Sequence, residues 1–406
     1  MVALLVTAGM AHAAGAEFAQ EAYLKASNTG NDDQFGNAVA ISGDTLVVGA
    51  FREQSSTTGV NSTPDDASGF AGAAYVYVRR DGAWEQQAYL KASNTDEGDR
   101  FGSSVAISGD TIVIGALEED SGSTGVNGSP DDLATNAGAA YVFRRSGDTW
   151  SQEAYLKASN AEANDEFGTS VAVSGDTIVV GAPNEDGGSS DVNGPQNNET
   201  SSSGAAYVFR RSNGSWRQEA YLKASNPGAA DSFGYAVSVS GDTIAVGARS
   251  EDTSVGGVNP PPDNAADLSG AVYVFERRNG QWAPDAFLKA SNVDMGDRFG
   301  TSVAIDGDTI VAGAVREDSS STGVDSVPDD DADFAGAAYV FHRRNGAWSQ
   351  QAYLKPFNTS AGDQFGNAVA VSGDLLVIGS ADEDGTATGV NGPDDDDFNG
   401  SGAAYV

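Results

Sequence analysis

Residues 101–116 read FGSSVAISGDTIVIGA, and this stretch decides the fold. Phe101–Ser108 alternates small or polar residues with apolar ones, a period of two that predicts a half-buried β-strand. Gly109 and Asp110 have the chemistry of a tight turn. Thr111–Ala116 is rich in β-branched residues, as expected of a buried strand. The stretch therefore predicts two β-strands joined by a tight turn.

Two further strands follow before the pattern begins again. Gly138–Arg144 (GAAYVFR) predicts a third strand, and Ser146–Asp148 has turn chemistry. Trp150–Ala158 (WSQEAYLKA) alternates and predicts a fourth strand. No segment of the chain has sustained helical periodicity, so we expect units of four β-strands.

The unit is repeated along the whole chain without an insertion. The Phe-Gly pair recurs at a constant step of 66 residues, and its phenylalanines are Phe35, Phe101, Phe167, Phe233, Phe299 and Phe365. Four strands per unit, repeated radially, predict an all-β fold, a β-propeller of four-stranded antiparallel blades. A linear β-solenoid normally has rungs shorter than 66 residues, so the propeller is favoured over it. We expect six blades in this chain, starting near residues 35, 101, 167, 233, 299 and 365.

The two ends of the chain suggest how the ring closes. Residues 18–27 (FAQEAYLKAS) match a lone fourth strand, and Ala403–Val406 lie inside the third strand of the sixth unit. We expect the N-terminal strand to complete this last blade, which removes an exposed sheet edge. A parent chain with a seventh unit is the alternative.

The first residues predict export. Val2–Met10 is a short apolar run, and Ala11–Ala13 has the small-x-small form of a cleavage site, although no positive residue precedes the run. We expect a signal peptide in residues 1–14 and the propeller in residues 15–406. The mature chain is then secreted or on the cell surface, and no later stretch is apolar enough to cross a membrane.

The composition narrows the classes of partner. The formal charge is −36, from 58 acidic and 22 basic residues. This balance disfavours nucleic acid and anionic membranes, whose phosphates attract Lys and Arg, and it suits cationic partners and divalent metals. The chain has no cysteine, which excludes disulfides and thiolate metal sites.

A family resemblance is carried by the first two strands. FGTSVAVS followed by IVVGAP, within Phe167–Pro183, resembles the FG-GAP repeat of the integrin α-subunit propeller. The resemblance covers essentially the whole chain after the signal segment. It implies four-stranded blades, extracellular placement and a role in adhesion or ligand binding, often with calcium. Integrin-type repeats commonly carry a DxDxDG calcium loop between these strands. Here that loop is only a tight turn, so the metal residues of the family cannot be carried over.

The acidic residues gather instead in the loop between the second and third strands, called here the BC loop. In the unit that starts at Phe101 it spans residues 117–137. Spaced carboxylate and amide oxygens are what Ca²⁺ requires. The candidate ligands, unit by unit, are Glu119, Asp120, Asn127, Asp131, Asp132, Glu251, Asp252, Asn259, Asp263, Glu317, Asp318, Asp325, Asp329, Asp330, Glu383, Asp384, Asn391, Asp395 and Asp396. The alternative is that Asp and Asn cap turns through their own backbone bonds while the other acids are solvated.

The loop between one unit's fourth strand and the next Phe-Gly, called here the DA loop, opens on the same face and adds acids such as Asp99. The opposite face carries arginine pairs such as Arg79-Arg80 and Arg144-Arg145. These either stack molecules face to face or orient the molecule on a surface, or they pair with nearby acids and keep the edge soluble. The tryptophan that opens each fourth strand, such as Trp150, is expected to pack between blades.

The sequence indicates a binding protein and not an enzyme. The only histidines are His12 and His342, and carboxylates are spread over six similar loops and form no single asymmetric site. We expect a module for adhesion or protein–protein interaction, monomeric as an isolated propeller. It would bind a protein or glycan on its acidic loop face and be stabilised by calcium. A lectin-like propeller and a structural spacer of a surface protein are the alternatives.

Overall fold

The computed structural model describes residues 21–392, 398 and 400–406, and the secondary structure of these residues consists of β-strands without a helix. The predicted fold class is confirmed: the strands form the consecutive antiparallel sheets of a β-propeller. Two compact units divide the chain, and the boundary between them runs through the third blade. The predicted signal peptide lies outside the described residues.

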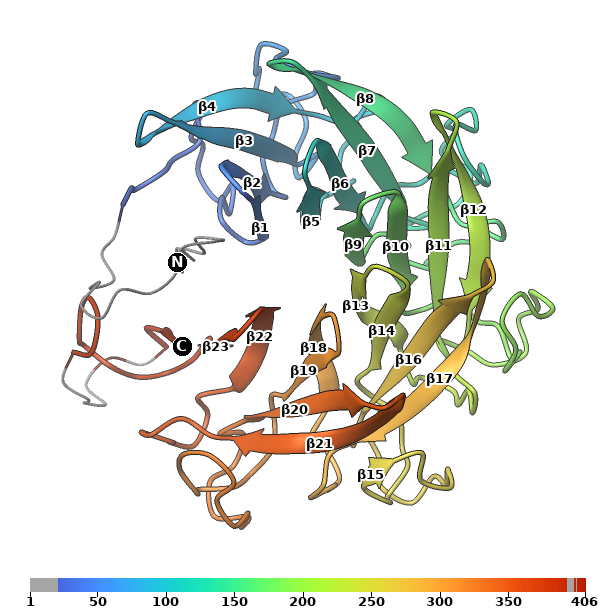
Figure 1. Ribbon diagram of the computed structural model, residues 1–406. Coiled ribbons are helices and arrows are strands. Elements are labelled where there is room, and N and C mark those ends of the chain that lie inside the picture. Colours follow the sequence, from blue (N-terminus) through green and yellow to red (C-terminus); the bar gives the residue numbers. More distant parts are fainter. Residues whose placement is uncertain (1–20, 393–397, 399) are drawn as a thin grey trace. The chain divides into compact units, whose positions relative to one another are not determined.

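The first unit holds blades 1 and 2 and most of blade 3, within residues 21–185 and 207–220. Each sheet follows the order of the chain (Figure 1). The strands are β1 (Val39–Ser42), β2 (Thr45–Ala50), β3 (Ala73–Arg80) and β4 (Ala83–Leu90) in blade 1, β5 (Phe101–Ser108), β6 (Thr111–Ala116), β7 (Ala139–Ser146) and β8 (Thr149–Leu156) in blade 2, and β9 (Ser170–Ser174), β10 (Thr177–Ala182), β11 (Ala205–Ser212) and β12 (Ser215–Leu222) in blade 3.

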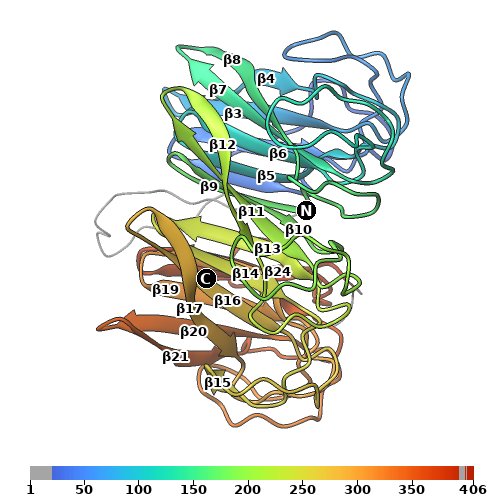
Figure 2. The same ribbon diagram turned by 90° about the vertical axis from the view of Figure 1, so that its right-hand side faces the viewer.

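The second unit holds blades 4 to 6. A short extra strand, β15, pairs with the outer strand of blade 4, and Figure 2 shows it at that edge. The strands are β13 (Phe233–Ser240), β14 (Thr243–Ala248), β15 (Gly257–Val258), β16 (Ala271–Arg278) and β17 (Gln281–Lys289) in blade 4, β18 (Phe299–Asp306), β19 (Thr309–Ala314), β20 (Ala337–Arg344) and β21 (Ala347–Leu354) in blade 5, and β22 (Phe365–Ser372), β23 (Leu375–Ser380) and β24 (Ala403–Tyr405) in blade 6.

Blade 2 shows how the local sequence forms each sheet. Ser108 pairs with Thr111 across the predicted tight turn, in which Gly109 has a φ of 56°. Every residue of β6 is buried, whereas most of β5 is half-buried, as the two sequence patterns predicted. The register shifts between Phe101 and Ser104, so the Phe-Gly pair begins with a bulge.

Neighbouring blades touch through glycine. A Cβ atom on Gly115 of β6 would lie 2.1 Å from the carbonyl oxygen of Gly168 in the next blade. Only a residue without a side chain allows this approach. Gly49, Gly247 and Gly313 make the same approach to the following blade, so these glycines are a packing requirement between blades.

The hydrophobic core also lies between blades. One buried cluster joins Val76 and Leu90 of blade 1 to Phe101 and Tyr141 of blade 2. Trp150 is buried and donates its indole N–H to Gln87 of the preceding blade at 2.8 Å. The expectation that the tryptophans pack between blades is confirmed here.

The described part of the N-terminal segment lies against blade 1. Residues 21–26 form no strand. Tyr77 donates its hydroxyl to the Lys25 carbonyl at 2.7 Å, and Gln86 donates to Ser27 at 3.0 Å. Gln152 of blade 2 donates the equivalent hydrogen bond to Ser93, which follows the outer strand of blade 1. The segment thus takes the place of an outer strand beside blade 1, and its pairing with the last blade stays a prediction.

Candidate ligand-binding face

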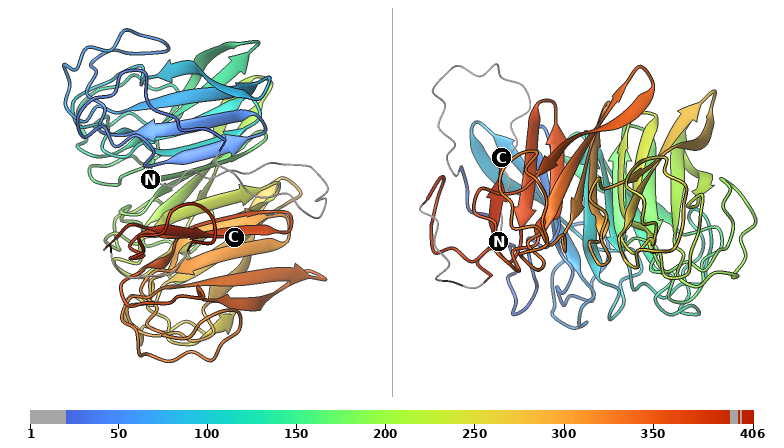
Figure 3. Two further views of the ribbon diagram at one scale, coloured as in Figure 1. Left: turned by 90° about the vertical axis from the view of Figure 1, so that its left-hand side faces the viewer. Right: turned by 90° about the horizontal axis from the view of Figure 1, so that it is seen from below.

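Within each unit the long BC loops project from one edge of the sheets and the short hairpins from the opposite edge (Figure 3). This arrangement follows from antiparallel strands, whose connections alternate between the two edges. We call the edge that carries the BC loops and DA loops the ligand face.

The glutamate at the start of each BC loop is buried. Glu119 accepts hydrogen bonds from Lys157 Nζ at 2.8 Å, from the Tyr155 hydroxyl at 2.7 Å and from Asn94 Nδ2 at 2.9 Å. Lys157 also donates to the Gly138 carbonyl at 2.6 Å. The lysine of the recurring YLKAS phrase, to which sequence reasoning gave no role, therefore ties the base of the loop to the outer strand.

The same ion pair recurs in the second unit, from Lys289 to Glu251 at 2.8 Å and from Lys355 to Glu317 at 2.9 Å. Burial lowers the pKa of each of these lysines, and the charge of the glutamate partly offsets the effect. In blade 6 Glu383 accepts a hydrogen bond from Asn358 Nδ2 at 3.1 Å.

The aspartate that follows the buried glutamate caps a left-handed residue at the end of the loop. Asp120 Oδ1 accepts the Asn136 backbone N–H at 2.7 Å, and Asn136 has a φ of 54°. Asp252, Asp318 and Asp384 accept the equivalent N–H groups at 2.7–2.9 Å. These carboxylates fix the return of the loop toward the third strand.

The amide or aspartate in the middle of the loop pairs with the fourth strand. Asn127 Oδ1 accepts the Tyr155 N–H at 2.9 Å, and Asn127 donates its own N–H to the Tyr155 carbonyl at 2.7 Å. Asn259 and Asp325 do the same, and Asn391 has the same left-handed backbone, with a φ of 52°.

The first aspartate of each acidic pair caps the loop tip. Asp131 Oδ1 accepts the N–H groups of Gly122 at 2.7 Å and of Leu133 at 3.2 Å. Such hydrogen bonds hold the pKa of Asp263 and Asp329 below the usual range. The second members, Asp132 and Asp330, are exposed, whereas Asp395 and Asp396 lie outside the described residues.

Most of the candidate calcium ligands thus have a structural role of their own. Capping by Asp and Asn, the alternative derived from the sequence, is observed in the BC loops. Across the described part of the chain no three Asp, Glu, His or Cys side chains gather in a way that could hold a metal ion. Calcium binding stays a prediction.

Aspartates of the DA loops are buried beside these acids. Asp99 is 3% exposed and accepts the Asp96 N–H at 2.8 Å. Burial, together with the charges of Glu119, Asp96 and Asp120, raises the pKa of Asp99 to about 8. Asp297 has the same environment, and burial likewise raises its pKa to about 8.

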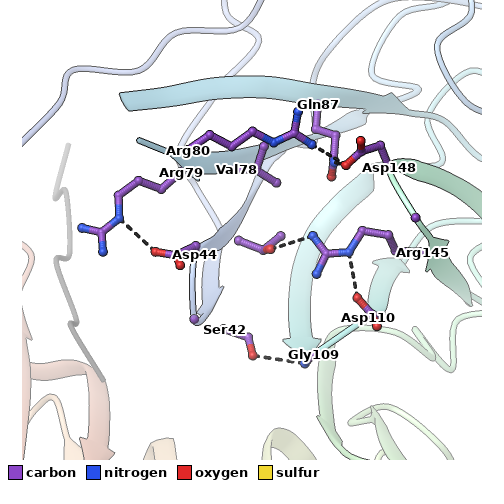
Figure 4. A pocket seen from close by; sticks show the side chains of 13 residues that line it. Ser42, Asp44, Val78, Arg79, Arg80, Gln87, Gly109, Asp110, Arg145 and Asp148 are labelled. Atoms are coloured by element: carbon purple, nitrogen blue, oxygen red, sulfur yellow. Dashed lines mark hydrogen bonds and ion pairs between the residues drawn. The ribbon is translucent and has the colours of Figure 1, made fainter. Parts of the chain in front are cut away.

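The opposite edge bears the arginine pairs around a depression of about 680 Å³ in the first unit (Figure 4). Arg79 pairs with Asp44 at 2.9 Å, Arg145 pairs with Asp110 at 2.7 Å, and Arg80 pairs with Asp148. The interpretation that these arginines pair with nearby acids therefore holds here.

Sequence reasoning missed three positions of the ligand face at which the residue differs from one 66-residue repeat to the next. One precedes each Phe-Gly pair, and the other two follow the second strand. They are Gln34, Arg100, Glu166, Ser232, Arg298 and Gln364 at the first position, Phe51, Leu117, Pro183, Arg249, Val315 and Ala381 at the second, and Arg52, Glu118, Asn184, Ser250, Arg316 and Asp382 at the third. A position-by-position alignment of the six units would have found them.

At the first of these positions the backbone is the same in all six repeats although the side chains differ. At the first position all six residues are left-handed, with φ between 53° and 58°. The flanking Phe-Gly pair does not change, and most of the varying side chains are half-buried. A constant backbone thus presents side chains of different size and charge.

The recurring strands, the Phe-Gly bulge and the close glycine contacts agree with the comparison to known families. A model described as the FG-GAP repeat matches the chain six times, at residues 18–77, 84–143, 150–209, 216–275, 282–341 and 348–406. The chain belongs to the FG-GAP repeat family. Among curated proteins none matches the chain significantly. FG-GAP propellers are typically extracellular and typically not enzymes. In the described residues no helix is long and apolar enough to cross a membrane.

Proposed function

We propose that this FG-GAP propeller is a secreted or cell-surface module that binds a protein partner through its ligand face. One observation carries the proposal. Six repeats that keep the Phe-Gly pair and the left-handed residue before it differ in charge and size at three positions of that face, most of which are half-buried. Half-buried positions of a purely structural repeat are restrained by packing. Their divergence fits selection for one asymmetric partner.

The surface chemistry supports a protein as the partner. Exposed apolar side chains lie among the acids of the loops, including Leu133, Val327 and Phe334. A mixture of apolar and charged groups is typical of protein–protein interfaces. The net charge of −36 favours a partner that is basic over much of its surface.

Charge reversal on the two faces tests the proposal. The immobilised chain is exposed to a panel of purified extracellular proteins, and each hit is measured again with Asp132→Lys and Asp330→Lys on the ligand face. Asp176→Lys, in an exposed hairpin of the opposite edge, changes the net charge equally and is the matched control. We expect ligand-face variants to weaken binding and the control to retain it. Loss in the control alone would contradict the proposal.

We also propose that calcium stabilises the ligand face. The raised pKa of Asp99 and Asp297 reflects carboxylates held close to other carboxylates, a repulsion that a divalent cation relieves. Exposed Asp132 and Asp330 lie near the same sites, because they raise the pKa of Asp96 and Asp294.

A further inference from the structure

Three arginines of the second unit come together on the ligand face although the protein is strongly acidic. Arg249 follows β14, Arg316 follows β19, and Arg298 precedes β18. β14 and β18 are neighbours in Figure 1, and a Cβ atom on Gly247 would lie 2.1 Å from the Gly300 carbonyl oxygen. The ends of these strands therefore bring Arg249 and Arg298 to one place.

Arg316 joins them through the pairing within blade 5. Phe299 pairs with Ala314. Arg298, which precedes Phe299, therefore lies near Arg316, which is two residues after Ala314. The charges of Arg316 and Arg249 both lower the pKa of Arg298, in addition to its burial. No carboxylate contributes to this shift, and only Tyr235 opposes it.

The three guanidinium groups have no acidic partner. Within the part of the chain that the structure describes, none of them forms an ion pair or a side-chain hydrogen bond to protein. The Nε atoms of Arg249 and Arg298 are buried without a hydrogen-bond partner. Arg100 Nε is also without a hydrogen bond, but the charge of Arg100 is balanced by Glu118. Leaving buried charged donors unpaired costs free energy, so the cluster is suited to a ligand that supplies the missing charge.

The equivalent arginines of the first unit are neutralised. Arg52 pairs with Asp32 at 2.9 Å, and Arg100 pairs with Glu118 at 2.9 Å. In blade 5 glycine stands at the position of Asp32, and Arg316 stands at the position of Glu118. The same backbone thus carries paired arginines in one unit and unpaired arginines in the other. This difference is specific to the sequence of blades 4 and 5.

Aromatic rings border the cluster. The Arg249 guanidinium carbon lies 3.7 Å from the centroid of the Tyr235 ring, and that of Arg316 lies 5.0 Å from the Phe334 ring. Phe334 is 47% exposed and has a φ of 59°. A left-handed backbone is unfavourable for a bulky side chain. Asn136 and Gly400, at the same position of other blades, tolerate it better, whereas Phe70 of blade 1 shares the strain beside the paired Arg52. Phe334 is thus a strained, exposed aromatic beside a cation.

We propose that Arg249, Arg298 and Arg316 bind a carboxylate group on an acidic segment of the protein partner, with Phe334 contacting an apolar residue beside it. The inference rests on the proposed function and names the chemistry of its contact. The arginine fork binds carboxylates through paired N–H donors. A phosphate-rich polymer fits less well, because it carries a charge on every unit and the acidic surface around the site repels it more than a short segment with one or two carboxylates.

The test uses the full chain and a blocked peptide, acetyl-GDFDG-amide, titrated by calorimetry at constant ionic strength. We expect saturable binding that an Asn-substituted peptide lacks. Arg298→Gln and Arg316→Gln should each weaken it by about tenfold or more, as expected for lost charged hydrogen bonds. Arg80→Gln and Arg145→Gln, at paired positions of the opposite edge, should leave the affinity unchanged. No binding, or equal weakening by the paired-position variants, would overturn the proposal.

Two further measurements complete the test. Without ligand, Arg298→Gln should unfold at the same temperature as the wild type or a higher one, because it removes a repelled cation; a clear fall would show a structural role. Tighter binding of inorganic phosphate or sulfate than of the peptide would overturn the carboxylate assignment. A partner that binds the ligand face equally well in Arg298→Gln would overturn this inference and leave the proposed function standing. A partner insensitive to all ligand-face charge reversals would remove both.

Discussion

At the scale of single residues, the buried ion pair under each BC loop is the contact with the largest expected effect. Glu119 and Lys157 are each at most 2% exposed and satisfy each other. Removing one partner of such a pair leaves a buried charge and costs about 3–5 kcal/mol. We therefore expect Glu119→Gln or Lys157→Met to lower the free energy of unfolding by that amount, measured by urea denaturation.

The control for this prediction is Arg80→Gln, which removes one member of an exposed pair on the opposite edge. Exposed pairs contribute at most about 1 kcal/mol. The double variant Glu119→Gln/Lys157→Met should cost less than the two single changes together, because no unpaired charge remains. Additive losses would show that the two groups stabilise the loop independently.

Asp99 makes a separate prediction about pH. Its pKa in the folded protein, about 8, lies above the value of about 3.9 for an unfolded aspartate. The folded state therefore binds more protons between these values, and the contribution of Asp99 is full below about pH 4 and is lost as pH rises through about 8. Asp99→Asn removes this term. We expect the stability of the wild type relative to Asp99→Asn to fall between pH 5 and pH 8, measured by urea denaturation.

Other carboxylates also titrate in the wild type, so the comparison with Asp99→Asn isolates the one group. Asn keeps an acceptor for the Asp96 N–H. A relative stability that is flat or rises with pH would mean that Asp99 is ionised in the folded protein. Asp297→Asn offers an independent repetition in the second unit.

At the scale of elements, the contact between blades requires glycine more strictly than the hairpin turns do. A Cβ on Gly115 would lie 2.1 Å from the Gly168 carbonyl oxygen, whereas one on Gly147 in a hairpin meets no atom within 4 Å. We expect Gly115→Ala to lower the free energy of unfolding by about 3 kcal/mol or more, because backbone must move. Gly147→Ala, which meets only the strain of a φ of 61°, should cost about 1 kcal/mol. Thermal unfolding of both variants measures the difference.

The elements also show how far sequence reasoning reached. The alternation in Phe101–Ser108 and the apolar Thr111–Ala116 predicted strands that the structure confirms. The acids of the BC loop were found, but their hydrogen bonds were not, because whether Asp131 faces solvent or the Gly122 N–H depends on the path of the loop. The Arg249 cluster needed tertiary structure, since its members come from different blades.

At the scale of the whole molecule, the formal charge of −36 destabilises the compact state through repulsion between carboxylates. Salt screens this repulsion, while buried pairs such as Lys157 and Glu119 are screened much less. We therefore expect the melting temperature to rise as sodium chloride is raised from about 10 mM to about 0.5 M. A falling melting temperature would mean that favourable surface ion pairs outweigh the net repulsion.

The salt response is also the baseline against which calcium must be judged. Any cation screens the acidic surface, whereas a ligand that binds only the folded state raises the melting temperature beyond the effect of ionic strength. We expect millimolar calcium to raise it by several degrees above sodium chloride of equal ionic strength, and EGTA to reverse the rise. Magnesium should have less effect, because it demands stricter octahedral geometry.

Variants locate the effect on the molecule. If calcium binds between the BC and DA loops, Asp132→Asn and Asp330→Asn should reduce the calcium-specific rise, because these acids lie near Asp96 and Asp294. The exposed hairpin variant Asp176→Asn removes the same charge and should keep the rise. An equal response to calcium, magnesium and sodium at matched ionic strength would assign the acidic loops to capping and solvation. The ligand face would then rely on its protein backbone and its lysine–glutamate pairs for rigidity.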